Sequence, residues 1–343
     1  DILIIGGGVA GCIAATAAFD ADPNANIVLL EKAAIRRSGA TARGMDAMNV
    51  AMVPGESTTE EYLESIDIIS QGVFLEENCR VLVENSFKAL KKLEAWGVPF
   101  PRDEESRYLT SRFHPKGKFM VEMRGDNFKP ILAEQVRSRG IRVYERTMAT
   151  KLLTVDGAAQ GVVAFNVRTG EPLIVSAKAV ILTCGGAGRV GLPSSGYLHG
   201  TFNPPYNSGG GFSMAYRAGA ELVNMEYTGT SAMSKDYNGP GLSTYIRHDG
   251  HLVNSLGERF LEKYAPNLME RAPAGIRYQA VLNEINEGRG PVYFKLSHLP
   301  EDTLDVIEEG VFTVERPTMK QFYESRGTDI RKDLIEIRLS EVY

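Results

Sequence analysis

The sequence predicts an α/β fold in which a parallel sheet carries an inserted β-meander and a second, α+β domain follows. Residues 2–5 are continuously apolar and lead through a glycine-rich turn into an alanine-rich stretch. That order is typical of a buried parallel strand followed by a helix. Between residues 141 and 176, short apolar stretches alternate with turn residues, which indicates antiparallel strands. A length of 343 residues allows two domains, at roughly 150 residues each.

The first third of the chain predicts a βαβ unit followed by a long helical stretch. We expect strands at residues 2–5 and 27–30 with a helix at 12–19 between them, which is the usual length of such a unit. Residues 59–96 begin with acidic residues and place apolar residues at helical spacing, and Gly97 ends the pattern. We therefore expect helix over this range.

The middle of the chain predicts the meander, and the end predicts the second domain. The composition becomes loop-rich from about residue 227, so we assign residues 228–333 to the second domain and residues 1–227 and 334–343 to the first. The remaining expected elements are helices at 126–139, 213–220 and 275–287, meander strands at 141–144, 151–155, 161–167 and 173–176, and a buried strand at 178–184.

Composition excludes several classes of protein. The net charge of −5, without a basic block, argues against a nucleic-acid partner. No run of about 18 apolar residues occurs, so we expect no direct membrane insertion. Cys12, Cys79 and Cys184 form no CxxC pair, which predicts neither a zinc nor an iron–sulfur site, and hence no metal site. Scattered thiols suit a reducing compartment, so we expect a cytoplasmic protein.

The strongest local signal is a glycine pattern between a strand and a helix. Gly6, Gly8 and Gly11 form G-x-G-x-x-G, in which the first permits the tight turn, the second admits a diphosphate and the third allows close helix packing. The helix N-terminus offers free N–H groups and a positive dipole end to phosphates. Glu31 closes the second strand, 20 residues after Gly11, where a carboxylate accepts ribose hydroxyls. Together these features favour dinucleotide binding over a purely structural glycine turn.

The loop after Glu31 favours FAD over NAD. Residues 32–49 are rich in glycine and small residues, whereas a nicotinamide-binding domain usually returns to a helix here. Such a loop can lie along a flavin, giving backbone N–H groups to its pyrimidine edge. Arg37 and Arg43 can offer charge to the flavin or to phosphate, with solvent exposure as the alternative. The cofactor-binding candidates of this loop are Lys32, Ser38, Gly39, Ala40, Arg43 and Gly44.

At this loop the chain resembles the fumarate reductase and succinate dehydrogenase flavoprotein family, and within it the adenylylsulfate reductase α subunit. The resemblance covers essentially the whole chain. Residues 37–40 and 44–49 resemble the flavin loop of that subunit. Residues 179–187 resemble a second flavin-contacting strand and turn, and residues 205–211 match the family as well. These two stretches add Cys184, Gly185, Gly186, Asn207 and Gly209 to the cofactor-binding candidates.

The second half resembles both branches of the family. Residues 235–240 are similar to a loop of adenylylsulfate reductase, whereas Gly-Glu-Arg-Phe at 257–260 is similar to the fumarate and succinate branch. The resemblance implies a Rossmann-like FAD-binding domain with an α+β capping domain at 228–333, and a return of the chain to the FAD-binding domain at 335–343. It also implies a C-terminal helical region outside this sequence.

The departures from the family pattern bear on chemistry. The fumarate and succinate branch attaches FAD through a histidine just after an Arg-Ser pair; Gly39 stands there, which implies noncovalent FAD. The HPTG substrate histidine of that branch has no counterpart between Tyr227 and Met233. The active-site arginine of the adenylylsulfate reductase branch is replaced at Met233 and Ser234.

Arg259, Asn49 and His248 are the candidates for catalysis. For Arg259 the resemblance implies proton delivery; an anion clamp or an ion pair with Glu258 or another acid are the alternatives. Asn49 matches an asparagine that lies over the flavin in adenylylsulfate reductase, with a plain loop cap as the alternative. His248 can relay protons with His251, because histidine titrates near neutral pH, unless both are surface histidines.

Three further polar residues complete the set. Lys129 matches a lysine of adenylylsulfate reductase, which implies a part in holding cofactor or substrate. His114 and His298 stand alone in the sequence, and we expect both to be structural.

The resemblance implies two-electron chemistry at flavin N5 on a small anionic substrate enclosed by the capping domain. The prediction is an adenylylsulfate reductase-like flavoprotein (α) subunit that receives electrons from a ferredoxin-like iron–sulfur β subunit. Two alternatives stay open. One is a fumarate or succinate-type oxidoreductase acting on a dicarboxylate or activated alkene. The other is an FAD-binding electron-transfer subunit without its own substrate.

Overall fold

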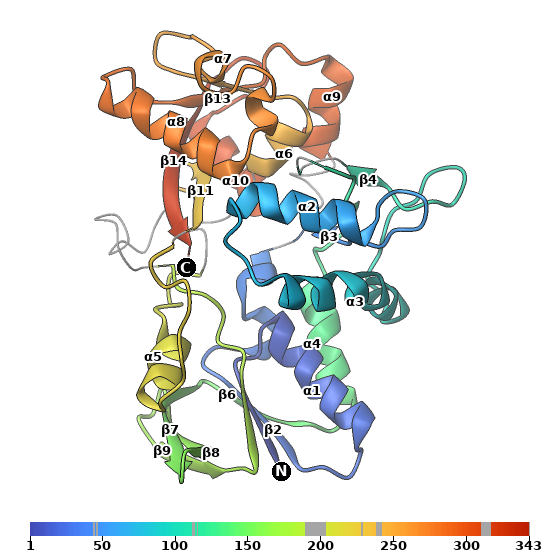
Figure 1. Ribbon diagram of the computed structural model, residues 1–343, viewed down its shortest axis with the longest axis vertical. Coiled ribbons are helices and arrows are strands. Elements are labelled where there is room, and N and C mark those ends of the chain that lie inside the picture. Colours follow the sequence, from blue (N-terminus) through green and yellow to red (C-terminus); the bar gives the residue numbers. More distant parts are fainter. Residues whose placement is uncertain are drawn as a thin grey trace.

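The computed structural model describes the chain except for residues 44, 46, 112, 113, 115, 189–203, 228, 238–241, 310–316 and 343. The N-terminal strands lie at one end of the molecule, and most of the elements after residue 228 lie at the other (Figure 1). Helices α2 (Thr59–Ser70) and α3 (Glu76–Ala95) lie between the two ends. Among the described residues, no helix combines the length and the apolar character needed to cross a membrane.

The first domain is built on a parallel sheet of order β10-β1-β2-β6. Successive side chains of a strand point to opposite faces, so Ile4 packs into the core on one side and Leu3 and Ile5 into the core on the other. Burial on both faces explains the continuous apolar run of the first strand. The strands are β1 (Ile2–Ile5), β2 (Ile27–Glu31), β6 (Arg142–Glu145) and β10 (Ala179–Leu182).

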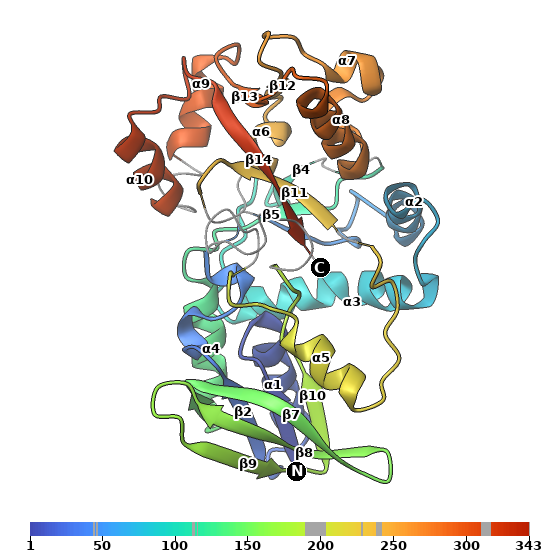
Figure 2. The same cartoon turned by 90° about the vertical axis from the view of Figure 1, so that its left-hand side faces the viewer.

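A helical layer covers one face of this sheet, and a β-meander covers the other (Figure 2). Helices α1 (Val9–Ala21) and α4 (Phe128–Ser138) share a core with Ile4 and Leu29. On the opposite face, Val162 of the meander and Met214 of α5 (Gly210–Arg217) pack on Leu3 and Leu30. The meander strands are β7 (Thr147–Val155), β8 (Ala158–Asn166) and β9 (Pro172–Ser176).

One expected meander strand belongs elsewhere. The sequence places residues 141–144 at the start of the meander, but β6 pairs in parallel with β2, with Leu30 opposite Tyr144. The interpretation is wrong because a short apolar run does not show which sheet the strand joins. Helix α4 precedes β6, and a helix is the usual connection between two parallel strands. The meander therefore has the order β7-β8-β9.

The segment between β2 and α4 forms the middle of the molecule. The helical stretch expected at 59–96 is divided, because α2 ends at Gln71 in the left-handed region, with φ of 54°, and Gly72 follows with φ of 83°. A capping box of Thr58 and Glu61 starts α2. The short elements here are 3-10 turns η1 (Ile35–Arg37) and η2 (Ala40–Arg43), and strands β3 (Ala47–Asn49), β4 (Thr110–Ser111) and β5 (Met120–Glu122), in the order β3-β5-β4.

The second domain has its own antiparallel sheet, of order β11-β14-β13-β12, and its own core. Tyr245, Phe294 and Leu296 are fully buried in that core. Its elements are β11 (Gly229–Ser234), α6 (Leu242–Arg247), β12 (His251–Val253), α7 (Leu261–Tyr264), η4 (Met269–Arg271), α8 (Ala274–Asn286), β13 (Tyr293–Lys295), α9 (Glu301–Asp305), α10 (Pro317–Arg326) and β14 (Ile335–Val342).

The last strand corrects one part of the expected domain division. The sequence assigns residues 334–343 to the first domain, but β14 pairs with β11 and β13. Ile335 and Ile337 lie buried in the core of the second domain, which holds the strand there. The boundary between residues 227 and 228 stays a prediction.

Candidate functional site

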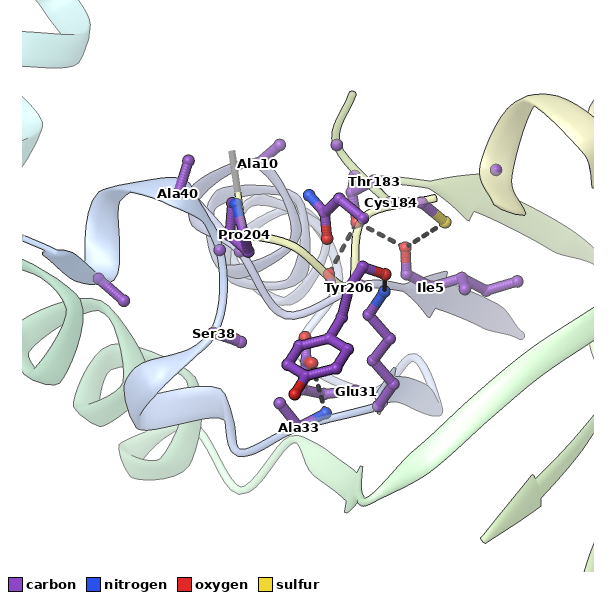
Figure 3. Close-up of a pocket in the computed structure, with 18 of the residues that line it drawn as sticks. Ile5, Ala10, Glu31, Ala33, Ser38, Ala40, Thr183, Cys184, Pro204 and Tyr206 are labelled. Atoms are coloured by element: carbon purple, nitrogen blue, oxygen red, sulfur yellow. Dashed lines mark hydrogen bonds between the residues drawn. The ribbon is translucent and has the colours of Figure 1, made fainter. Parts of the chain in front are cut away.

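A cavity of about 1200 Å³ opens beyond the carboxyl ends of β1, β2 and β10 (Figure 3). From β1 the chain continues into β2 on one side and, much later, enters β10 on the other. Open α/β sheets bind ligands at such a point, where the strand order reverses. The lining residues come from the glycine turn, the loop after Glu31, the end of β10 and residues 204–211.

The glycine turn has the backbone geometry that its sequence predicts. Gly6 has φ of +105°, and a Cβ there would lie 2.4 Å from the carbonyl oxygen of Thr183. A Cβ at Gly11 would lie 1.8 Å from the carbonyl oxygen of Gly6, so α1 starts directly against the turn. At Gly8 the nearest atom would be 3.8 Å away, which leaves this backbone open to the cavity. No side chain caps α1, so its first N–H groups remain for an anion.

Glu31 lies where the prediction requires it, on the cavity wall and 5% exposed. Its Oε2 accepts a hydrogen bond from the Gly7 N–H at 2.6 Å, and its Oε1 accepts one from the Ala33 N–H at 2.7 Å. These two bonds orient the carboxylate. Because a carboxylate has about four acceptor positions, capacity remains for ribose hydroxyls.

The loop after β2 lies against the glycine turn. The Ser38 hydroxyl donates to the carbonyl of Gly7 at 2.9 Å. Gly39 has φ of +85°, and a Cβ there would lie 3.0 Å from the Cα of Gly8. Ala40 and Arg37 also line the cavity. Of the other candidates in this loop, Gly44 lies outside the described residues and only the backbone of Arg43, at the end of η2, is described.

Lys32 and Cys184 also line the cavity. The Lys32 ammonium donates to the carbonyl of Tyr206 at 2.6 Å, and burial lowers the pKa of Lys32. The Cys184 thiol lies 3.5 Å from the carbonyl of Ile5, and burial raises the pKa of this thiol. In Figure 3, Cys184 lies on the side of the cavity away from Ser38 and Ala40.

A second helix N-terminus faces the same cavity. Gly209 precedes α5 with φ of +78°, and no side chain caps that helix. Gly185, with φ of +71°, approaches Asn207, and Gly186 completes this stretch of the lining. The candidates from residues 184–209 therefore gather with those of the glycine turn.

The catalytic candidate Arg259 does not line this cavity. It forms a two-point ion pair with buried Glu270, with Nε–Oε1 at 3.1 Å and Nη2–Oε2 at 2.5 Å. Burial alone raises the pKa of Glu270, but the Arg259 guanidinium and the Leu252 N–H outweigh it and hold that pKa below its usual range. This geometry matches the ion-pair alternative, with Glu270 rather than Glu258 as the acid.

The two histidines of the predicted relay have different surroundings. The ring of His251 stacks on His298, with centroids 3.7 Å apart. His248 follows α6, and burial, with the charge of Arg247, lowers its pKa. The contacts described for this part of the chain include none between His248 and His251, so a relay between them lacks a geometric basis.

Asn49 and Lys129 lie outside the lining of the cavity. Asn49, at the end of β3, is bonded through Oδ1 to Nε2 of His114 at 2.9 Å. Lys129 is 1% exposed, and its ammonium lies 3.2 Å from Sγ of Cys12 in α1. That thiol lies 3.5 Å from the carbonyl of Gly7, so Lys129 supports the glycine turn from behind.

Several lining residues were missed by sequence reasoning. Asp126 and Asn127 precede α4, where the predicted helix start at 126 was the available signal. Thr147 lines the cavity from the start of β7, and no sequence pattern marks it. Among the described residues, no three His, Cys, Asp or Glu side chains gather where they could hold a metal ion.

Comparisons with known proteins identify the family of the chain. A family model described as FAD binding domain matches residues 1–313. The chain is 30% identical, over 98% of its length, to a subunit of the CoM/CoB fumarate reductase from Methanothermobacter marburgensis, of which it covers 61%. It is also 30% identical, over 85% of its length, to the alpha subunit of adenylylsulfate reductase from Megalodesulfovibrio gigas, of which it covers 49%.

The structure of adenylylsulfate reductase from Archaeoglobus fulgidus aligns with the whole chain, with a TM-score of 0.86 and 27% identity, and the chain covers 58% of it. The chain thus spans between about half and three fifths of the length of these relatives. The predicted family, fold class and cofactor are confirmed. The chain binds FAD and belongs to the flavoprotein family that contains the fumarate reductase, succinate dehydrogenase and adenylylsulfate reductase flavin subunits.

Proposed function

We propose that this chain is the FAD-binding part of an oxidoreductase flavoprotein subunit that reduces a small anionic substrate, of the adenylylsulfate reductase type. The observation that carries the proposal is the cavity at the carboxyl ends of β1, β2 and β10. It joins the open backbone at Gly8, the oriented carboxylate of Glu31 and the loop at residues 38–40 in one wall.

The residues present fit FAD. The first N–H groups of α1 suit the diphosphate, and Glu31 suits the adenosine ribose. The loop at residues 38–40 and the turn at 184–186 line the cavity with small residues and backbone. These residues leave room for a flat ring system. When bound, FAD supplies two-electron chemistry at N5, and these residues bind and orient it.

Noncovalent attachment follows from Gly39. The position where a histidine would attach the flavin has no side chain, and even a Cβ there would contact Gly8 at 3.0 Å with φ of +85°. A larger residue would therefore displace the loop from the glycine turn. The same substitution separates this chain from the covalent fumarate and succinate branch.

Positive charge near the cavity supports an anionic substrate. Lys32, Arg36 and Arg37 line it, and they outnumber Glu31 and Asp126 within the described lining. The absence of a histidine at residues 227–233 counts against the dicarboxylate type, although the arginine of the adenylylsulfate branch is absent at Met233 and Ser234 as well. The 30% identity over 98% of the chain with a fumarate reductase subunit keeps the dicarboxylate type as the second candidate.

We further propose that electrons arrive from a ferredoxin-like iron–sulfur subunit. Cys12, Cys79 and Cys184 are free and separate thiols, which provide no cluster site in this chain. The two curated relatives described above are named as subunits, which is consistent with such a partner.

The test is anaerobic reoxidation of the reduced flavin. The purified chain is loaded with FAD, reduced, and mixed with adenylylsulfate or with fumarate while the flavin absorbance is followed. Reoxidation by adenylylsulfate is expected, and reoxidation by fumarate alone would favour the second candidate. Reoxidation by neither would overturn the proposed activity and favour an electron-transfer role without a substrate.

A further inference from the structure

The small sheet β3-β5-β4 is attached directly to the cavity wall. Residues 38–42 of that wall run into β3, and residues 126 and 127 of the wall follow β5. Asn49 ends β3 opposite Met120, and the next N–H, of Val50, donates to the carbonyl of Phe119 at 2.7 Å. The sheet therefore holds the backbone at Asn49, the last residue of the predicted flavin loop.

His114 holds the side chain of Asn49. Its Nε2 lies 2.9 Å from Oδ1 of Asn49. Because an amide oxygen only accepts, the Nε2 atom of His114 donates the proton. The bond fixes the plane of the carboxamide and directs its NH2 group away from the imidazole. Among the contacts of the described residues, none engages these NH2 donors, and the Asn49 side chain is exposed.

The imidazole itself is held by aromatic packing. The ring of Tyr62 meets it edge-on, with centroids 6.4 Å apart, and the ring of Phe119 lies at 6.0 Å. Tyr62 and Phe119 belong to one buried cluster with Ala51 and Val83. A histidine on a fixed aromatic base can orient a partner with little loss of its own rotamer freedom.

The surroundings of His114 disfavour the charged form of its imidazole. Burial lowers the pKa of His114, and the positive charge of Arg277 in α8 lowers it further. A neutral imidazole with its proton on Nε2 donates to Asn49 without bringing a positive charge into the site.

We propose that His114 is a positioning residue, which fixes the Asn49 carboxamide so that its NH2 group donates to an acceptor oxygen at the bound flavin or on an anion beside it. This inference rests on the proposed function, since both acceptors require FAD in the cavity. It replaces the expectation that His114 is only structural.

The test compares five variants of the FAD-loaded chain: four single variants and the double variant that combines Asn49→Ala with His114→Phe. Asn49→Ala removes the donor, and His114→Phe keeps an aromatic ring on Tyr62 and Phe119 but removes the bond to Asn49. His114→Gln keeps a side-chain N–H donor, and His298→Phe is the matched control at an exposed histidine that stacks on another ring. Two quantities are measured: the midpoint potential of the flavin, which reports a contact to the flavin, and the dissociation constant for sulfite, read from bleaching of the flavin absorbance, which reports a contact to an anion.

Asn49→Ala and His114→Phe are expected to move the same quantity by the same factor, about five-fold, which is the contribution of one hydrogen bond of ordinary net strength. On the potential this factor corresponds to about 20 mV, at about 30 mV per tenfold for two electrons. The double variant should change no more than either single variant. His114→Gln should restore most of the effect, and His298→Phe should behave as the wild type.

Three outcomes would overturn the inference alone: His114→Phe at wild-type values while Asn49→Ala is shifted, additive effects in the double variant, or no shift in any variant. A wild-type chain that takes up no FAD would overturn the proposed function as well, so the two failures are distinguishable.

Discussion

Replacing Gly11 by alanine tests the close backbone contact between helix α1 and the glycine turn. Alanine is the better helix former, by roughly 0.5–1 kcal/mol, so an unobstructed change of this kind stabilises a protein. At Gly11 the added methyl would lie 1.8 Å from the Gly6 carbonyl oxygen and 2.9 Å from Oγ1 of Thr183. That hydroxyl shares its one proton between the carbonyls of Ile5 and Gly6, which hold it in place.

The steric clash decides whether Gly11→Ala stabilises or destabilises the protein. Relieving the clash moves the start of α1 by more than an ångström, and overpacking of this kind costs about 1–3 kcal/mol. We expect Gly11→Ala to lower the free energy of unfolding by about 1–2 kcal/mol after the helix gain is subtracted. The displaced N–H groups should also weaken FAD binding by about ten-fold or more, since a hydrogen bond to a charged group is worth about 1.5–3 kcal/mol.

Gly275 provides the matched control. It is the second residue of α8, another helix of 13 residues, and a Cβ there would meet no atom within 4 Å. Gly275→Ala should therefore raise the free energy of unfolding by roughly 0.5–1 kcal/mol and leave FAD affinity unchanged. Urea unfolding of the apoprotein and fluorescence titration with FAD measure both quantities. Equal stability and equal FAD affinity in the two variants would refute the reasoning.

Three further predictions concern charged residues. Glu31→Gln should weaken FAD binding by about ten-fold or more in the same titration, because it removes a charged acceptor; unchanged affinity would contradict the assigned role. Arg259→Gln should lower the free energy of unfolding by about 2 kcal/mol or more, because it leaves the buried carboxylate of Glu270 without its ion-pair partner. FAD affinity should stay constant, and a selective loss of FAD binding would argue for a cofactor role instead. Hydrogen bonds from Arg289, outweighing burial, lower the pKa of Glu284 from 4.5 to about 2. A lowered folded-state pKa gives stability that is complete above about pH 4.5 and is lost as the pH falls toward 2. Glu284→Gln should flatten this acid dependence of unfolding, and an unaltered pH profile would exclude the pair as its source.

The strand–turn–helix at the start of the chain was predictable because its signals are local. Gly6 and Gly11 mark a turn that only glycine fits, and the burial of β1 and β2 on both faces follows from one continuous apolar run. Glu31 was predictable for the same reason, since its distance from Gly11 is set by one helix and one strand.

Other features depend on contacts between distant residues, and the sequence pattern does not encode them. The break after α2 is set by left-handed Gln71, a residue type with no preference for that backbone region. Strand β14 joins the second domain through pairing with β11, about a hundred residues earlier in the chain. The partner of Arg259 is chosen by the packing of Glu270, and the bond between Asn49 and His114 joins residues far apart in the sequence.

The central claim is that the diphosphate of FAD lies on the N–H groups at the start of α1, with its ribose on Glu31. A crystal structure of the chain with FAD tests it most directly. The account predicts phosphate oxygens within hydrogen-bond distance of backbone N–H groups at residues 8–10 and a ribose hydroxyl on the Glu31 carboxylate. FAD bound elsewhere, or Glu31 directed away from the nucleotide, would contradict it.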